Sequence, residues 1–173
     1  MSTLTEATLL PRKASLSTAS SALTRAGQTW FIVAAAGQLI FAWYIAVLYG
    51  SSALRGDWAT WNKVMPRGWN EGDTVGNVAI VVHLLLALVV TLAGLVQLVP
   101  AIRRAAPQVH RSTGRVYIAS AFGIAFGSMY LMWVRGAVGD LSQHIGSTLN
   151  AILLVAFAVI ALRHARHCDL AAH

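Results

Sequence analysis

The sequence predicts an all-α integral membrane protein whose four transmembrane helices form a bundle, and three observations support this. Hydrophobic residues make up 57% of the 173-residue chain and charged residues only 11%, against roughly 45–50% and about 25% in soluble globular proteins. The mean hydropathy is +0.62. Four apolar runs each approach the ~20 residues that a helix needs to cross the hydrocarbon core. Unpaired backbone groups are costly in lipid, so each run is expected to be helical.

The four runs cover about residues 29–49, 75–99, 116–134 and 145–162, and they predict a transmembrane domain over residues 29–163. Residues 1–28 are rich in Ser, Thr and Ala, which predicts a flexible cytoplasmic tail before an uncleaved first span. Residues 164–173 form a second cytoplasmic tail. Pro100 directly follows the second run, as is typical just past the end of a helix.

The distribution of Lys and Arg orients the four spans. Nine of the 13 lie in the two tails and the basic turn at residues 100–114, together with Arg163 and Arg115, which adjoin these regions. The opposite side holds four, Arg55, Lys63, Arg67 and Arg135, which are balanced by the four acids Asp57, Glu71, Asp73 and Asp140. The positive-inside rule therefore predicts that both termini and the basic turn are cytoplasmic. Because topology accounts for the net charge of +7, we expect no nucleic-acid partner.

Three of the six tryptophans, Trp58, Trp61 and Trp69, lie in the predicted outer loop. Tryptophan is enriched at membrane interfaces, which predicts a loop or short helix on the outer membrane surface. A lid over a substrate site is the alternative.

Small and polar residues follow one face of the second span at steps of three and four. The members of this stripe are Gly76, Ala79, His83, Ala87, Val90, Gly94 and Gln97. The third span has a similar stripe of Ser120, Gly123, Gly127 and Tyr130. Small residues let helices approach closely in lipid, so both stripes are expected to face the interior of the bundle.

His83 is the main candidate for a functional residue, because an ionisable side chain inside a span is a functional hypothesis by default. It lies about 12 Å below the outer end of its helix. One interpretation is an axial ligand of a b-type haem. A second is a quinone-binding or proton-transfer group. The third is a neutral imidazole that secures packing by a hydrogen bond to a residue such as Tyr130 or Asn150.

A b-type haem needs a second axial ligand at a similar depth. His144 supplies an imidazole but lies near the outer surface, whereas Met129 and Met132 lie closer to the depth of His83, so His–Met ligation is an alternative. At the opposite side His110 and His164 lie at comparable depth and are candidates for a second haem site. The alternative for these two is a headgroup-facing cluster among arginines.

The basic turn predicts contact with lipid headgroups, through Arg103, Arg104, Arg111 and Arg115. Haem propionates or a quinone headgroup are the alternatives for the pair of Arg111 and Arg115, which share a face if the helix begins early enough. The single cysteine, Cys168, excludes an intrachain disulfide and a C-x-x-C-H haem attachment. Soluble-enzyme signatures such as G-x-G-x-x-G, H-E-x-x-H and G-x-S-x-G are missing from the sequence.

From about Val75 onward the chain resembles the bacterial predicted membrane proteins of "domain of unknown function 2306". The resemblance rests on His83, then Gly94, Gln97-Leu98, Pro100 and Arg103, and above all on His110-Arg111-x-x-Gly114-Arg115-x-Tyr117. It implies a multi-pass bacterial inner-membrane protein and supplies no catalytic residue. Family members usually continue past a segment such as 169–173, so either a short member or a truncated sequence is expected.

Two function classes follow from these observations. The first is a redox subunit that binds b-type haem or exchanges electrons with quinone around His83. The second is a non-catalytic scaffold or accessory subunit that binds lipid or other subunits of a membrane complex. Whether the chain is an enzyme is not decided by the sequence.

Overall fold

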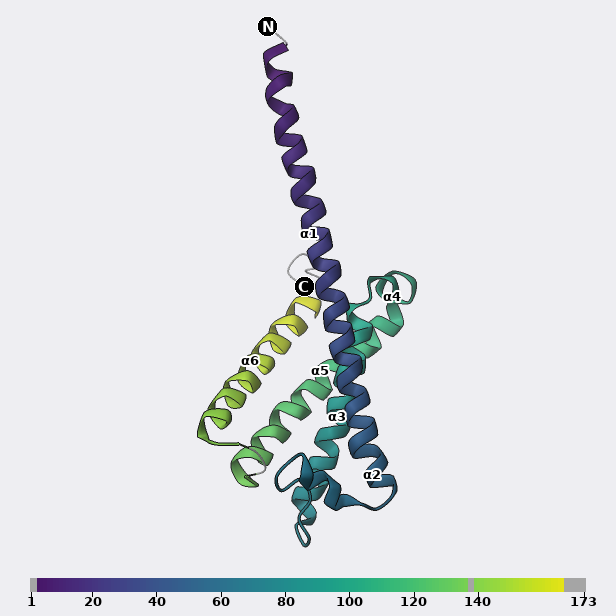
Figure 1. The fold of residues 1–173 in the computed structure, drawn as a ribbon, viewed down its shortest axis with the longest axis vertical. Coiled ribbons are helices and arrows are strands. Elements are labelled where there is room, and N and C mark those ends of the chain that lie inside the picture. The colour runs from purple at the N-terminus through teal and green to yellow at the C-terminus, as the bar shows by residue number, and fades with distance from the viewer. Residues whose placement is uncertain (1–2, 137–138, 167–173) are drawn as a thin grey trace. The chain divides into compact units, whose positions relative to one another are not determined.

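The computed structural model describes residues 3–136 and 139–166, and it confirms the all-α class (Figure 1). Four helices are long and apolar enough to cross a membrane: Ser21–Leu54, Thr74–Leu98, Pro107–Val134 and Leu141–His164. No strand occurs in the described part of the chain. Most of the predicted C-terminal tail, Cys168 included, lies outside the described residues.

The chain divides into two units, residues 1–38 and residues 39–173. Within the first unit, helix α1 (Thr3–Tyr44) begins at Thr3, far ahead of residue 29, where the apolar run predicts the first span. Residues 12–28 contain no proline and one glycine, and four of them are Ala, the strongest helix former. Hydropathy therefore marks the apolar part of this helix and not its beginning.

In the second unit, α1 continues into a π-helical segment, η1 (Ile45–Gly50), and the short helix α2 (Ser51–Leu54). Serine hydroxyls contact carbonyl groups of η1. Ser51 donates to the carbonyl of Val47, and Ser52 donates to the carbonyls of Leu48 at 2.7 Å and Tyr49 at 3.1 Å. The loop that follows contains the 3₁₀ helix η2 (Trp58–Lys63), which Asp57 caps through Thr60.

The remaining elements are α3 (Thr74–Leu98), α4 (Pro100–Ala105), α5 (Pro107–Met129), the π-helical η3 (Tyr130–Val134) and α6 (Leu141–Arg166). The bounds of α3 agree with the predicted second span to within one residue at each end. Helix α5 begins at Pro107 and not at about residue 116, and α6 begins at Leu141 and not at about residue 145. Pro100 and Pro107 each stand in the first turn of a helix, where the missing N–H costs nothing.

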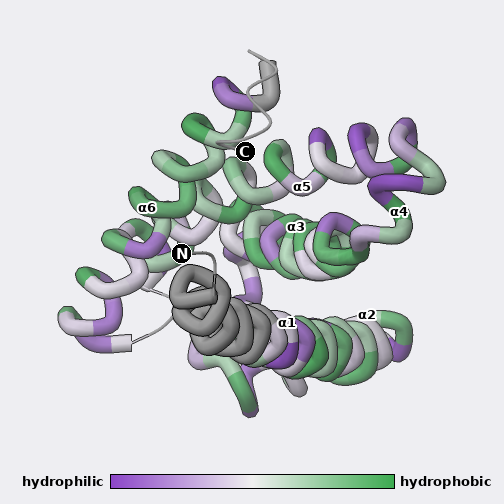
Figure 2. Tube along the Cα trace, turned by 90° about the horizontal axis from the view of Figure 1, so that it is seen from above, coloured by the Kyte–Doolittle hydropathy of each residue, from purple (hydrophilic) through white to green (hydrophobic). Residues whose placement is uncertain are grey.

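Helix α5 packs against both α3 and α6, and Figure 2 shows it between them. The α3–α5 contact is antiparallel. His83 lies beside Gly127, Leu86 beside Gly123, and Gln97 beside Gly114, so the two residue numbers of each pair add up to 209–211. One end of this contact carries Asp73 and Arg135 and is here called the Asp73 end. The other end carries Gln97 and is called the Gln97 end.

The buried core lies toward the Asp73 end. It consists of Ile45, Tyr49, Trp61, Ile80 and Leu131, from the first span, the loop, α3 and η3. Large apolar side chains elsewhere are mostly exposed, above all on α6, where Ile152 is 59% and Phe157 66% exposed. In a membrane these side chains face hydrocarbon, so the small core agrees with the membrane assignment.

Candidate functional site

At the Asp73 end the buried residue Arg135 joins η3 to α3. Its side chain is 3% exposed, and its Nε donates to Asp73 Oδ2 at 2.9 Å. Its Nη2 donates to Asn77 Oδ1 at 2.6 Å. One edge of the guanidinium is therefore used by two oxygens from successive turns of α3, while Nη1 is buried and has no hydrogen-bond partner among the described residues.

Three residues of the α3 N-terminus are arranged around this guanidinium. Asp73 caps the helix, because its Oδ1 accepts from the backbone N–H of Gly76 at 2.8 Å. A Cβ on Gly76 would lie 2.5 Å from Arg135 Nε, so only glycine leaves room for the ion pair. Asn77 also binds the preceding loop: its Nδ2 donates to the carbonyl of Asn70 at 2.7 Å, and its Oδ1 accepts from the Asn70 N–H at 3.1 Å.

The hydrogen bond from the Gly76 N–H lowers the pKa of Asp73 below its ordinary value, and Arg135 lowers it further. Asp73 is therefore ionised at neutral pH. The ion pair fixes the end of α5–η3 against the start of α3.

The three loop tryptophans form an aromatic cluster beside the core. Trp58 stacks on Trp69 with ring centroids 4.3 Å apart, and Trp61 meets both rings edge-on. Trp61 is 3% exposed, and its Nε1 donates to Ser52 Oγ at 2.8 Å and to the Tyr49 carbonyl at 3.3 Å. The loop is thus packed onto the first span through Trp61, which the interface rule for tryptophan does not predict.

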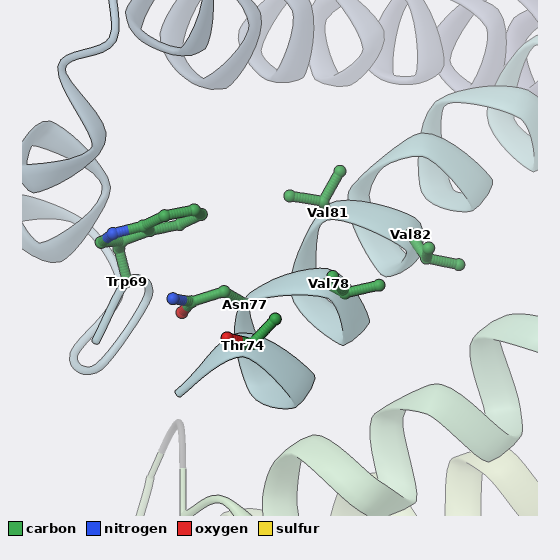
Figure 3. A pocket seen from close by; sticks show the side chains of 6 residues that line it. All are labelled: Trp69, Thr74, Asn77, Val78, Val81 and Val82. Carbon is green, nitrogen blue, oxygen red and sulfur yellow. The ribbon is translucent and has the colours of Figure 1, made fainter. Parts of the chain in front are cut away.

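A small pocket of about 250 Å³ lies beside Trp69 (Figure 3). Its wall is the face of α3 that carries Thr74, Asn77, Val78, Val81 and Val82. Asn62 fixes the backbone of Trp69, because its Oδ1 accepts from the backbone N–H and its Nδ2 donates to the backbone carbonyl, both at 2.8 Å. The polar groups of Asn77 are already paired, so the pocket presents mainly apolar surface.

The two π-helical segments meet in the core. Ile45 and Tyr49 of η1 and Leu131 of η3 belong to the same buried cluster as Ile80. Single π-helical turns are uncommon and occur frequently at functional sites. Both segments lie in the half of the protein that also holds His83.

His83 lies about 13 Å along α3 from Thr74, on the face that contacts α5. The ring is half-buried, and Nδ1 is fully buried opposite Gly127, where a Cβ would lie 3.6 Å away. No hydrogen bond to His83 occurs among the described residues. Neither Tyr130 nor Asn150 provides the predicted packing bond, and Nδ1 packs closely against α5 at Gly127.

His144 does not lie beside His83. Its ring meets the Trp133 ring edge-on at 5.1 Å, and Trp133 Nε1 donates to Thr148 Oγ1 at 2.9 Å. Trp133 follows Gly127 by six residues along α5–η3, so His144 lies about 10 Å closer to the Asp73 end than His83 does. It also belongs to α6, which packs against α5.

The two methionines also differ from His83 in position. Met129 follows Gly127 by two residues, which is about 200° around a helix and places it on the far side of α5 from His83. Met132 is 9% exposed within η3, and it follows Gly127 by five residues, which places it about 7 Å closer to the Asp73 end than His83. The structure therefore brings His83 together with Gly127 and with none of the three candidate axial partners.

At the Gln97 end the H-R-x-x-G-R-x-Y element contacts the end of α3. Gln97 Nε2 donates to the carbonyl of His110 at 2.8 Å and to Thr113 Oγ1 at 2.6 Å. A Cβ on Gly114 would lie 3.3 Å from Gln97 Oε1, so glycine here permits the close approach. Nδ1 of His110 is buried without a hydrogen-bond partner among the described residues. His164 lies at the corresponding end of α6 and is half-buried.

Sequence reasoning assigned Arg135 only to the count of outer charges and missed its burial. Its partner Asp73 is 62 residues away in the sequence, and no local spacing connects the two. One signal was present in the sequence. Asp73 and Arg135 each adjoin the outer end of an apolar run, and each of these two runs carries a stripe of small residues that suits a close contact between the helices.

Comparison with known proteins adds a family assignment. The family model of the predicted membrane proteins DUF2306 matches residues 80–173, which is more than half of the chain. No curated protein and no solved structure matches this chain. Within the described residues, no group of three or more His, Cys, Asp or Glu side chains is placed to hold a metal ion.

Proposed function

We propose that this chain, which belongs to the DUF2306 family of predicted membrane proteins, is a redox subunit of a membrane system that acts through His83. The observation that carries the proposal is the half-buried imidazole in the span, which forms no hydrogen bond to any of the described residues. Burying a polar group without a partner costs free energy, so a ligand that bonds the ring would stabilise the site.

A quinone headgroup is the ligand that this arrangement supports best. One imidazole is enough to bind a quinone carbonyl, and the half-buried ring of His83 leaves an edge accessible from the bilayer. When two electrons from a donor subunit reduce the quinone, each oxygen takes up one proton, and an imidazole exchanges a proton near neutral pH. His83 would then orient the headgroup and transfer a proton to one oxygen.

A b-type haem fits the described residues less well. His83 supplies one imidazole of a kind that holds haem iron, which carries one electron at a time. Met129, Met132 and His144 lie on other faces or at another depth, so no second ligand faces His83 in this arrangement.

Binding of a short-chain ubiquinone to the purified chain, followed by tryptophan fluorescence, tests the proposal. We expect His83→Ala to weaken binding by roughly tenfold, the equivalent of one hydrogen bond. His83→Gln keeps a donor and should recover part of the affinity. His144→Ala is the matched control and should bind as the wild type does. Equal affinity of the wild type and His83→Ala would contradict the proposal.

The second candidate is an accessory subunit without redox chemistry, and the exposed surface of α6 favours it. Ile145, Leu149, Ile152 and Phe157 are each more than half exposed. In this case His83→Ala leaves quinone binding and all redox activity of the membrane unchanged. Replacing these exposed apolar residues of α6 by polar ones would instead disturb assembly with partner subunits.

A further inference from the structure

We propose that the elbow formed by α4 and the start of α5, residues 100–115, binds the phosphate group of anionic phospholipids. The elbow carries Arg103 and Arg104 in the last turn of α4 and Arg111 and Arg115 in the first turns of α5. This inference concerns the Gln97 end of the protein. It does not depend on the role proposed for His83.

The four arginines are exposed, and no carboxylate compensates them. All four side chains are exposed to the surroundings of the protein. The sequence contains no acidic residue between Asp73 and Asp140, and among the described residues none of the four arginines takes part in an ion pair. Figure 2 shows the hydrophilic residues gathered on α4 and the adjoining turns of α5. The elbow therefore presents positive charge to an anionic partner.

The length of the third span places this charge at headgroup level. The helix from Pro107 to Val134 has 28 residues, whereas ~20 residues cross the hydrocarbon core. The polar residues 108–115 account for the excess. Arg115 then lies near the edge of the hydrocarbon, and Arg111 lies about 6 Å further out on the same helix face. Both guanidinium groups fall within the headgroup layer.

The elbow is also fixed to the rest of the protein. Gln97 at the end of α3 holds the first turns of α5 through the carbonyl of His110 and the hydroxyl of Thr113. Gly114 allows this contact, and α4 packs against both α3 and α5. Arginine binds phosphate through paired N–H groups, and guanidinium groups on a fixed backbone lose less freedom when they do so.

Native mass spectrometry of the full chain, released from vesicles, tests the inference. The vesicles contain phosphatidylcholine alone or phosphatidylcholine with phosphatidylglycerol. We expect retention of phosphatidylglycerol and little retention of phosphatidylcholine. Arg111→Gln and Arg115→Gln should each weaken this retention by roughly tenfold, as expected for the loss of a charge-assisted contact.

Arg163→Gln is the matched control, because Arg163 is also exposed and lies at the corresponding end of α6. It should change retention by less than about twofold. A loss from Arg163→Gln equal to that from Arg111→Gln would show diffuse attraction and overturn the site. Displacement of the lipid by millimolar inorganic phosphate would assign the elbow to a small anion and would also overturn the proposal. Equal retention of phosphatidylglycerol and phosphatidylcholine would also overturn the proposal.

Discussion

Removing the charge of Asp73 should destabilise the protein more than removing its partner Arg135. The two side chains differ in exposure: Arg135 is 3% exposed and Asp73 is 35% exposed. In Asp73→Asn the guanidinium stays buried without a counter-charge. In Arg135→Met the carboxylate that remains is still solvated and still accepts from the Gly76 N–H.

The expected costs follow from this difference in exposure. Asp73→Asn leaves the buried guanidinium without its counter-charge, and a buried charge that loses its partner is strongly unfavourable. We therefore expect Asp73→Asn to be the most destabilising of the variants. Arg135→Met removes the buried charge together with its bonds, which costs on the order of 1–2 kcal/mol. The double variant Asp73→Asn/Arg135→Met has no unpaired charge. It should therefore be more stable than Asp73→Asn alone.

Equilibrium unfolding of the full chain in mixed micelles of increasing dodecyl sulfate content, followed by helical circular dichroism, measures these differences. Asp57→Asn is the matched control, because Asp57 also caps a helix but forms no ion pair among the described residues. It should destabilise the protein much less than Asp73→Asn does, because Asn caps nearly as well as Asp. The reasoning is refuted if Arg135→Met is as destabilising as Asp73→Asn, or if the double variant is the least stable of the three.

Three further predictions concern the Asp73–Arg135 pair, the hydrogen bonds of Gln97 and the packing of Trp61. The folded-state pKa of Asp73 is lowered, first by the Gly76 N–H and then by Arg135. The pair therefore contributes stability above the unfolded pKa of about 3.9, and this contribution is lost as the pH falls through the folded pKa. Because the pKa values of Asp57 and Asp140 are lowered too, a pH titration of unfolding should show a larger loss in the wild type than in Asp73→Asn. Gln97→Leu removes two hydrogen bonds to α5 and should lower stability by about 1–2 kcal/mol. Amide hydrogen exchange in the first turns of α5 should become faster, and unchanged exchange would show that Gln97 does not hold these turns. Trp61→Phe loses the hydrogen bond to Ser52 and some buried volume, and it should lower stability by about 2 kcal/mol in the same unfolding assay. Trp133→Phe is the control, because Trp133 is 52% exposed, and it should lower stability less.

The sequence allowed accurate prediction where one signal dominated. Helix α3 was predicted almost to the residue, because its apolar run is as long as the helix itself. The stripe of small residues on α3 was expected to face the interior of the bundle, and α5 packs against it. Gly127 and Gly114 indeed lie against residues of that stripe.

The remaining features depend on contacts that hydropathy does not encode. The apolar run does not mark the start of α5 at Pro107, because the turns before residue 116 are mostly polar and are helical all the same. The burial of Arg135 depends on Asp73, Gly76 and Asn77 from another helix. The packing of Trp61 under the loop likewise depends on Ser52 and Tyr49, which an interface preference for tryptophan does not reveal.

The most direct test of the proposed redox role of His83 is a difference spectrum, reduced minus oxidised, from the ultraviolet to the visible. It is recorded on the wild type and on His83→Ala, each purified with its native lipids. The account predicts a quinone-to-quinol change in the wild type that His83→Ala loses while its helical circular dichroism stays the same. If the wild type shows Soret and α bands that His83→Ala loses, the redox role of His83 stands, but its ligand is haem and not quinone. A flat spectrum in the wild type, or an identical change in both proteins, would contradict the account.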